Sequence, residues 1–334
     1  MTELIMRPER VLMTGATGFL GRHLTEAFHR HGYEVVASAR TKNDAMMADD
    51  WVLGDIGSPD VQQLAVKGCA VVVNAAGRVK KDELSVKDHE LMYHSNTEMV
   101  ASLAMSAMQA GIKRFVHISS TGVYGKRAHG LCDELTPCHP DNIYEKSKYD
   151  GEEKLLRIQN STMQLVVVRP SNIFGEMHPW NKLLTWMKVV KSGKALLTAN
   201  PDQYFVNYVY VSDEAEAIIS LVESRHVIGG EVLNINTPQS INEFYHATAK
   251  AVGVNYSFHT IPRTVLVLIA TFFDIMSRIT GRSLPLTKTK VEELTGQRVF
   301  SSERLKKLCP DFPKIGLKEG LVRLARHYRD SGLL

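Results

Sequence analysis

Tyr144 and Lys148 form a pair of side chains that could perform acid/base chemistry. They lie four residues apart in the sequence YEKSK, so a helix would place both on one face. A phenol with a pKa of about 10 is a poor base at neutral pH. A neighbouring ammonium group stabilises the phenolate and brings its pKa closer to the working range. Alone this spacing means little, because such a pair can arise by chance, and the position of the pair after a predicted strand matters more.

Two serines follow a run of residues that is typical of a buried strand. Residues 115–118 read Phe-Val-His-Ile, and Ser119 and Ser120 come directly after them. In a parallel α/β sheet, ligands bind at the carboxyl ends of the strands. We therefore expect both serines at the ligand-binding edge of the sheet.

A glycine-rich loop, TGATGFLG, begins at Thr14 directly after the apolar residues 11–13. Gly15 would permit a tight turn, Gly18 would let the backbone approach a pyrophosphate, and Gly21 would permit close packing of strand and helix. The N-terminus of the following helix supplies unpaired N–H donors. The loop predicts a dinucleotide site, and a tight turn without a ligand is the alternative.

The residues after the next two strands bear on the choice of dinucleotide. In dinucleotide-binding folds, an acidic residue at the end of the second strand, about 20 positions beyond the glycines, binds the ribose hydroxyls. In this sequence the second predicted strand ends in Ser38-Ala39-Arg40, which contains no carboxylate. Arg40 is a planar donor that suits a 2′-phosphate, which favours NADP over NAD, although a solvated arginine is also common there. Asp55, followed by Ile56, could accept from the adenine amino group or serve only as a turn residue.

The elements that must position these groups alternate along the first half of the chain. We expect strands at residues 10–13, 34–38, 70–74, 114–119 and 165–169, and helices at 19–31, 96–110 and 144–159. This order predicts a doubly wound parallel α/β sheet of the Rossmann type over residues 1–175, to which residues 205–237 return. Residues 176–204 and 238–334 would form a smaller, mostly α-helical substrate lobe.

Six segments together resemble the extended short-chain dehydrogenases/reductases of the NAD-dependent epimerase/dehydratase family. They are TGATGFLG (14–21), VVNAAG (72–77), ISSTGVYG (118–125), YEKSK (144–148), RPSNIFG (169–175) and YVYVSD (208–213), in the family's order and spacing. The resemblance implies that Tyr144 is the general acid/base. It also implies that Lys148 lowers the pKa of that phenol and holds the nicotinamide ribose, and that Ser120 hydrogen-bonds the reacting oxygen.

The same resemblance implies which residues contact the cofactor. They are Gly15, Thr17, Gly18, Phe19, Leu20, Gly21, Arg40, Asp55, Ile56, Ala75, Ala76, Gly77, Tyr144, Lys148, Pro170 and Ser171, with the last two against the nicotinamide. Asn172 would lie near the substrate. A homodimer is implied through the helices at 96–110 and 144–159.

Evidence on the substrate class is divided. Members of this family that bind a nucleotide diphosphate commonly have Arg at the position of Val206. A valine there argues against a nucleotide-sugar substrate, whereas Asn172 is weak evidence for one. Residues 264–276 are apolar nearly all round a helix, which predicts a buried packing helix, a lid over an apolar substrate or a contact with a membrane surface. The segments at 284–287 and 300–305 loosely resemble sterol dehydrogenase-like and dihydroflavonol reductase-like members.

We therefore expect an NADP-preferring oxidoreductase that acts on a small molecule, a hydrophobic or aryl ketone or secondary alcohol. A nucleotide-sugar epimerase or 4-keto reductase is the first alternative, and a redox-sensing protein that only binds the nucleotide is the second. Retention of Ser120, Tyr144 and Lys148 argues against a sensor. Thr121 and Gly122 stand where the family's sugar dehydratases have Asp-Glu, so we expect no dehydration.

Composition and charge argue against several other classes. Lys and Arg number 40 against 36 Asp and Glu, a net charge of +4 spread along the chain, so nucleic acid is not the expected partner. No apolar run reaches the roughly 20 residues that span a bilayer, and the start lacks a signal-peptide pattern. The four cysteines contain no Cys-x-x-Cys pair, which favours a cytoplasmic location. His89 and His94 miss a zinc-binding helical spacing, and we expect no metal.

Overall fold

The computed structural model describes residues 9–79, 85–158, 162–179, 182–255, 258–280, 287, 291 and 295–334. Its central sheet has seven parallel strands in the order β11-β7-β5-β4-β1-β2-β3. They are β1 (Arg10–Thr14), β2 (Glu34–Ala39), β3 (Asp50–Leu53), β4 (Val71–Asn74), β5 (Arg114–Ile118), β7 (Gln164–Pro170) and β11 (Glu231–Ile235). The predicted doubly wound α/β fold is confirmed, and its strand order reverses between β1 and β4, where such sheets bind ligands.

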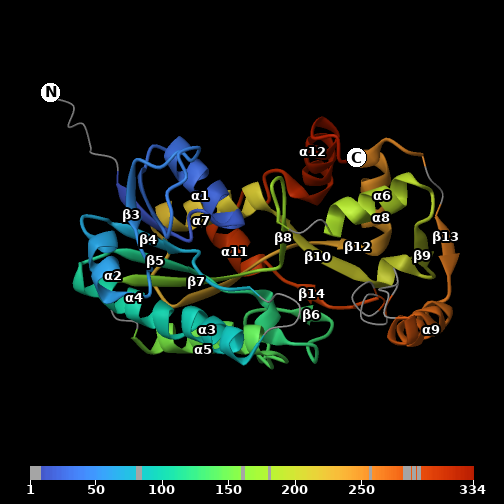
Figure 1. The fold of residues 1–334 in the computed structure, drawn as a ribbon, viewed down its shortest axis with the longest axis horizontal. Helices are drawn as coiled ribbons and strands as arrows, with labels where there is room; N and C mark the ends of the chain where they lie inside the picture. The colour runs from blue at the N-terminus through green and yellow to red at the C-terminus, as the bar shows by residue number, and fades with distance from the viewer. Residues whose placement is uncertain are drawn as a thin grey trace.

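Helices cover both faces of this sheet, as Figure 1 shows. One face carries α1 (Phe19–Arg30), α7 (Val211–Glu223) and α11 (Glu303–Leu308), and the other carries α2 (Pro59–Val66), α3 (Val86–Asn96), α4 (Glu98–Gln109) and α5 (Ile143–Ile158). Successive strand residues point to opposite faces, so Val71 and Val73 pack toward α1 and α7 while Val72 packs toward α4. Burial on both faces explains why the strands read as continuous apolar runs.

The helix predicted at 96–110 is preceded by another helix that was not predicted. Asn96 ends α3, and the chain bends at Thr97 (φ −122°, ψ −69°) before α4 begins. Thr97 Oγ1 donates to the carbonyl of Ser147 at 2.9 Å, and a Cβ on Gly151 would lie 2.3 Å from the carbonyl oxygen of Asn96. Helix α5 therefore packs directly on this bend.

The second lobe combines helices with small sheets. A three-stranded sheet has the order β12-β10-β8, and β13 pairs with β9. The elements are β8 (Asn172–Phe174), α6 (Lys182–Lys191), β9 (Leu196–Thr198), η2 (Pro201–Gln203), β10 (Phe205–Tyr210), β12 (Thr237–Ser240), α8 (Ile241–Val252), β13 (His259–Ile261), α9 (Arg263–Thr280) and α12 (Gly316–Asp330). Three further short elements are η1 (Thr121–Tyr124), β6 (Leu131–Cys132) and β14 (Val299–Phe300). Of the segments expected to return to the central sheet, β11 pairs with β7, whereas β10 pairs with β8 and β12. Among the described residues, no helix has both the length and the apolar character that crossing a bilayer requires.

A buried ion pair joins α5 to β7. Arg169 Nη2 lies 2.6 Å from Glu152 Oε2, and both side chains are almost fully buried, with 6% and 1% exposed. Arg169 Nη1 also donates to the hydroxyl of Tyr124 at 2.9 Å, and Ser119 Oγ donates to Glu152. The pair therefore connects the helix of the predicted catalytic residues with the ends of β5 and β7.

Replacing one partner of this pair should destabilise the fold strongly. In Arg169→Met the Glu152 carboxylate stays buried without a cation, so we expect a loss of about 3 to 5 kcal/mol in the free energy of unfolding, measured by urea denaturation. As a control, Lys318→Met removes an exposed pair with Glu243 and should cost less than about 1 kcal/mol. Equal losses in the two variants would contradict the role given to the buried pair.

Glu214, on the first turn of α7, is buried without a partner. Its side chain is 0% exposed, and neither carboxylate oxygen has a hydrogen-bond partner among the described residues. Burial raises the pKa of Glu214 to about 8. Because this pKa exceeds that of the unfolded chain, the folded state binds the proton more tightly and loses stability as the pH rises toward 8.

Glu214→Gln should therefore stabilise the protein at neutral pH. The amide has a similar shape and never ionises, so we expect a gain on the order of a few kcal/mol at pH 7 and a flatter dependence of stability on pH. Thermal unfolding between pH 5 and about 8 measures both effects. Glu216→Gln on the same helix is the control, because Glu216 pairs with Lys314 at 2.7 Å and its pKa is lowered by that partner. A Glu214→Gln protein no more stable than the native chain at pH 7 would refute this account.

Candidate functional site

The turn from β1 to α1 brings two glycines into close backbone contact. Gly15 has φ +65°, and a Cβ there would lie 2.7 Å from the carbonyl oxygen of Ala75. A Cβ on Gly21 would lie 2.1 Å from the carbonyl oxygen of Gly15, and Gly18 N donates to that same oxygen at 2.9 Å. The turn thus fits the predicted roles of the glycines and leaves the N-terminus of α1 at the carboxyl edge of the sheet, where a pyrophosphate would bind.

Three buried polar side chains lie beneath this turn. Thr14 Oγ1 donates to Asn74 Oδ1 at 2.6 Å and accepts from Ala76 N at 3.2 Å. Asn74 Nδ2 lies 3.1 Å from Nδ1 of His117. Since an amide nitrogen can only donate, His117 Nδ1 accepts, and burial lowers the pKa of His117 so that the ring is neutral. This chain fixes the loop that follows β4, which contains the predicted cofactor residues Ala75 to Gly77.

Ser120, Tyr144 and Lys148 meet at the carboxyl end of β5. The Ser120 hydroxyl lies near enough to Tyr144 to affect the pKa of its phenol, and Ser120 Oγ accepts from Gly122 N at 3.0 Å. Lys148 Nζ donates to the carbonyl of Ile118 at 2.8 Å. Tyr144 is half-buried on the first turn of α5, so its hydroxyl can meet both Ser120 and a ligand.

Burial changes the proton affinities of this group. It raises the pKa of Tyr144, although the neighbouring Ser120 hydroxyl opposes that rise, and it lowers the pKa of Lys148 to about 8. Lys148 Nζ donates to the carbonyl of Ile118, and burial has the largest effect on the Tyr144 phenol. The expected lowering of the Tyr144 pKa by Lys148 stays a prediction. At neutral pH the Tyr144 hydroxyl therefore carries a proton that it can donate.

Asn96 is a site residue that sequence reasoning missed. Its Nδ2 donates to the carbonyl of Arg78 at 2.9 Å and to Ser147 Oγ at 3.0 Å, and its Oδ1 accepts from Arg78 N at 2.9 Å. A Cβ on Gly77 would lie 2.8 Å from Asn96 Oδ1 and 3.3 Å from Lys148 Nζ. Asn96 thus hydrogen-bonds the loop after β4 and also α5, the helix of Lys148. No sequence motif around Asn96 predicted this role.

Other predicted cofactor residues line the same edge of the sheet. Ser171 Oγ, after β7, is buried without a partner among the described residues. The same holds for Ser38 Oγ near the end of β2, which was not among the predicted cofactor residues. Arg40 follows β2 and is exposed. Open glycine backbone, orphaned hydroxyls and an exposed guanidinium together fit a dinucleotide that lies across the ends of these strands.

The remaining predicted residues take local roles in the structure. Thr17 accepts from Arg22 Nε through its carbonyl, and the Phe19 ring meets the His178 ring at 4.5 Å. Leu20 packs against both large core clusters, and Pro170 ends β7. In the turn after β3, Asp55 Oδ1 accepts from Gly57 N at 2.9 Å and the carbonyl of Ile56 accepts from Gln62. The adenine contact of Asp55 therefore stays a prediction.

Two residues that bear on the substrate lie in the second lobe. Asn172 Nδ2 donates to the carbonyl of Asn207 at 3.0 Å and so links β8 to β10. Val206 is buried in the core of that lobe, where it has no means of binding phosphate. Thr121 and Gly122 begin η1, and the neighbouring carboxylate of Glu145 accepts from Asp141 N. Segment 284–286, used above for a resemblance, lies outside the described residues.

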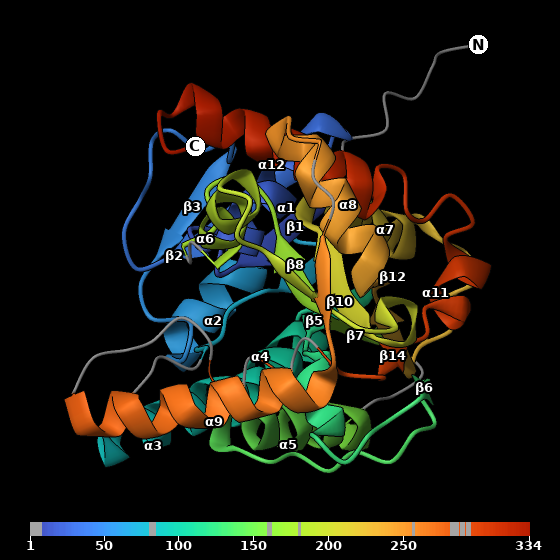
Figure 2. The same ribbon diagram turned by 90° about the vertical axis from the view of Figure 1, so that its right-hand side faces the viewer.

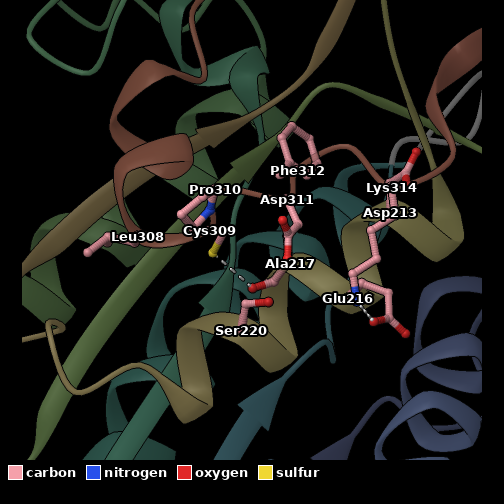
Figure 3. A pocket seen from close by; sticks show the side chains of 10 residues that line it. All are labelled: Asp213, Glu216, Ala217, Ser220, Leu308, Cys309, Pro310, Asp311, Phe312 and Lys314. Atoms are coloured by element: carbon pink, nitrogen blue, oxygen red, sulfur yellow. Dashed lines mark hydrogen bonds and ion pairs between the residues drawn. The ribbon is translucent and has the colours of Figure 1, made fainter.

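The YVYVSD segment has a structural task at a small cavity of about 80 Å³ between α7 and residues 308–314 (Figure 3). The carboxylate of Asp213 accepts from the backbone N–H groups of Ile315 and Gly316, both at 2.8 Å, at the N-terminus of α12. This cavity lies on the α7 face of the sheet, away from α5. It therefore belongs to the contact between α7 and residues 308–314, and not to the candidate site. His89 and His94 are exposed, as predicted. Among the described residues there is no cluster of three or more side chains that could hold a metal ion.

Comparison with known proteins agrees with this geometry. The model of the NAD dependent epimerase/dehydratase family matches residues 11–236. The chain is 26% identical over 308 residues to an N-acetyl-alpha-D-glucosaminyl-diphospho-ditrans,octacis-undecaprenol 4-epimerase of Escherichia coli O157:H7, covering 89% of this chain and 88% of that protein. It is 24% identical over 355 residues to a decarboxylating sterol-4-alpha-carboxylate 3-dehydrogenase of Saccharomyces cerevisiae, covering 97% and 99%.

A solved structure shares the fold across almost the whole chain. The UDP-glucuronic acid 4-epimerase of Bacillus cereus, in complex with NAD, aligns with a TM-score of 0.72 at 18% identity and covers 96% of this chain and 99% of its own. Since the family model spans the glycine turn, the Ser120–Tyr144–Lys148 group and β11, the chain belongs to the NAD-dependent epimerase/dehydratase family.

Proposed function

We propose that this chain is an NAD(P)-dependent oxidoreductase that transfers hydride between nicotinamide and a secondary alcohol or ketone. The observation that carries the proposal is that Ser120, Tyr144 and Lys148 lie together at the end of β5, with the glycine turn on the same edge of the sheet. A protein that only bound the nucleotide would need no proton donor at this place.

In this proposal the nicotinamide supplies or accepts the hydride, and the side chains handle the proton. Ser120 donates a hydrogen bond to the substrate oxygen and orients it. During reduction Tyr144 gives its proton to that oxygen, and during oxidation the phenolate takes the proton of the alcohol. The nearby Lys148 ammonium favours the phenolate, and the same ammonium would hold the nicotinamide ribose.

We infer that the substrate is hydrophobic. Val206 is buried where a phosphate-binding arginine would be needed for a nucleotide sugar. The relatives described above include one named for an undecaprenol-linked substrate and one named for a sterol.

A 4-epimerase is the second candidate, because the Escherichia coli relative and the Bacillus cereus neighbour carry that name. Incubating the protein with NADPH and a panel of carbonyl compounds separates the two candidates. Net loss of NADPH absorbance supports a reductase, whereas interconversion of epimers without net loss supports an epimerase. The homodimer through α4 and α5 stays a prediction.

Tyr144→Phe tests the assignment of the acid/base. The variant keeps the ring but loses the proton, so we expect turnover to fall by roughly two to four orders of magnitude while cofactor affinity stays nearly constant. Steady-state rates and a cofactor titration measure the two quantities. Tyr149→Phe on the same helix is the control and should keep full activity. A fully active Tyr144→Phe protein would rule out this mechanism.

Arg40→Ala tests the preference for NADP. If the exposed Arg40 meets the 2′-phosphate, its loss should weaken NADPH binding by about 1.5 to 3 kcal/mol and leave NADH binding almost unchanged. Fluorescence titration with each dinucleotide gives both affinities. Arg30→Ala removes another exposed arginine, on α1, and should change neither. Equal weakening of both dinucleotides by Arg40→Ala would show that Arg40 does not read the phosphate.

A further inference from the structure

Helix α9 exposes a continuous apolar stripe. Five large side chains recur at intervals of three and four residues along one face, Val265, Leu268, Phe272, Ile275 and Ile279, and they are 38% to 72% exposed. Among the described residues, no other helix exposes more than two large apolar side chains. Isolated exposed apolar residues are ordinary on a protein surface, but a contiguous row of this kind marks an interaction site.

The opposite side of α9 is the side that packs on the protein. Leu266 and Ala270 are buried there and form a small cluster with Val291. In Figure 1 the helix lies at the end of the molecule opposite β3, and Figure 2 shows its full length on the side that faces the viewer. The sequence left open a buried helix, a lid or a membrane contact, and the buried-helix interpretation is wrong because one face stays exposed.

Charge is distributed unevenly between the two parts of the chain. The segments 176–204 and 238–334, which include α9, carry 19 Lys and Arg against 10 Asp and Glu, a net charge of +9. The rest of the chain carries 21 against 26, a net charge of −5. Without α11, which packs on the central sheet, these segments still carry 16 Lys and Arg against 9 Asp and Glu, a net charge of +7. The apolar stripe therefore belongs to a basic lobe, and an amphipathic helix in a basic setting is suited to the interface of an anionic bilayer.

We infer that α9 docks this protein on the surface of anionic membranes. The helix lies parallel to the bilayer, its apolar stripe enters the boundary between headgroups and acyl chains, and the basic lobe is attracted to the phosphate groups. The inference does not depend on the proposed reaction, because α9 is separate from Ser120, Tyr144 and Lys148 in the fold.

Vesicle co-sedimentation tests this inference. We expect the full-length protein to sediment with vesicles of phosphatidylcholine and phosphatidylglycerol, to sediment far less with phosphatidylcholine alone, and to be released by high salt. The double variant Leu268→Gln/Phe272→Gln should bind the anionic vesicles about a hundredfold more weakly, because two apolar side chains that would enter the bilayer are lost. Phe272→Leu keeps an apolar side chain and should keep most of the binding.

The matched control is Leu135→Gln/Ile228→Gln, which removes two apolar side chains that are each 84% exposed elsewhere on the molecule. This variant should bind vesicles like the native protein. Absence of native binding to anionic vesicles would overturn the inference, and so would equal binding by Leu268→Gln/Phe272→Gln. Light scattering gives a third check. A native oligomer that dissociates in the α9 variant, with no vesicle binding, would show that a second copy covers the stripe instead.

Discussion

The ion pair between Glu152 and Arg169 is the interaction on which the geometry of the site depends. The pair is buried, so separating the two charges would leave each of them in the protein interior without a partner, which strongly destabilises the fold. Glu152 lies one helical turn beyond Lys148, and Arg169 directly precedes the Pro170-Ser171 segment on the sheet. A single contact therefore sets the distance between the helix that carries Tyr144 and Lys148 and the end of β7.

Much of the fold could be predicted because parallel strands buried on both faces leave a strong local signal. The centres of β1, β4, β5 and β7 are apolar, and Gly15 and Gly21 between β1 and α1 stand where a side chain would collide with backbone. The small strands β8 and β9 escaped prediction because three residues carry no period. Asn96 escaped for another reason, since its partners Arg78 and Ser147 are distant in sequence.

The two catalytic assignments illustrate what spacing alone can and cannot give. The interval from Tyr144 to Lys148 correctly placed both residues on one helix, and the strand before Ser120 correctly placed that hydroxyl beside them. The effect of burial on their proton affinities was not available from the sequence, because desolvation depends on every neighbour of the site. Burial here keeps Tyr144 protonated, which suits a donor in carbonyl reduction. The apolar character of α9 was equally ambiguous, because only the packed structure distinguishes the face against Val291 from the face in solvent.

Asp213 has a mechanical consequence for the whole molecule. It stands on α7, which packs with α1 against the central sheet, yet its carboxylate holds the first backbone amides of α12, which packs on α8 in the other lobe. Within the second lobe, Gly320 of α12 approaches the ring of Tyr210 so closely that a Cβ there would lie 2.8 Å from it. Asp213 thus ties the first turn of α12 directly to α7, so the start of α12 keeps its position relative to the helix layer on the central sheet.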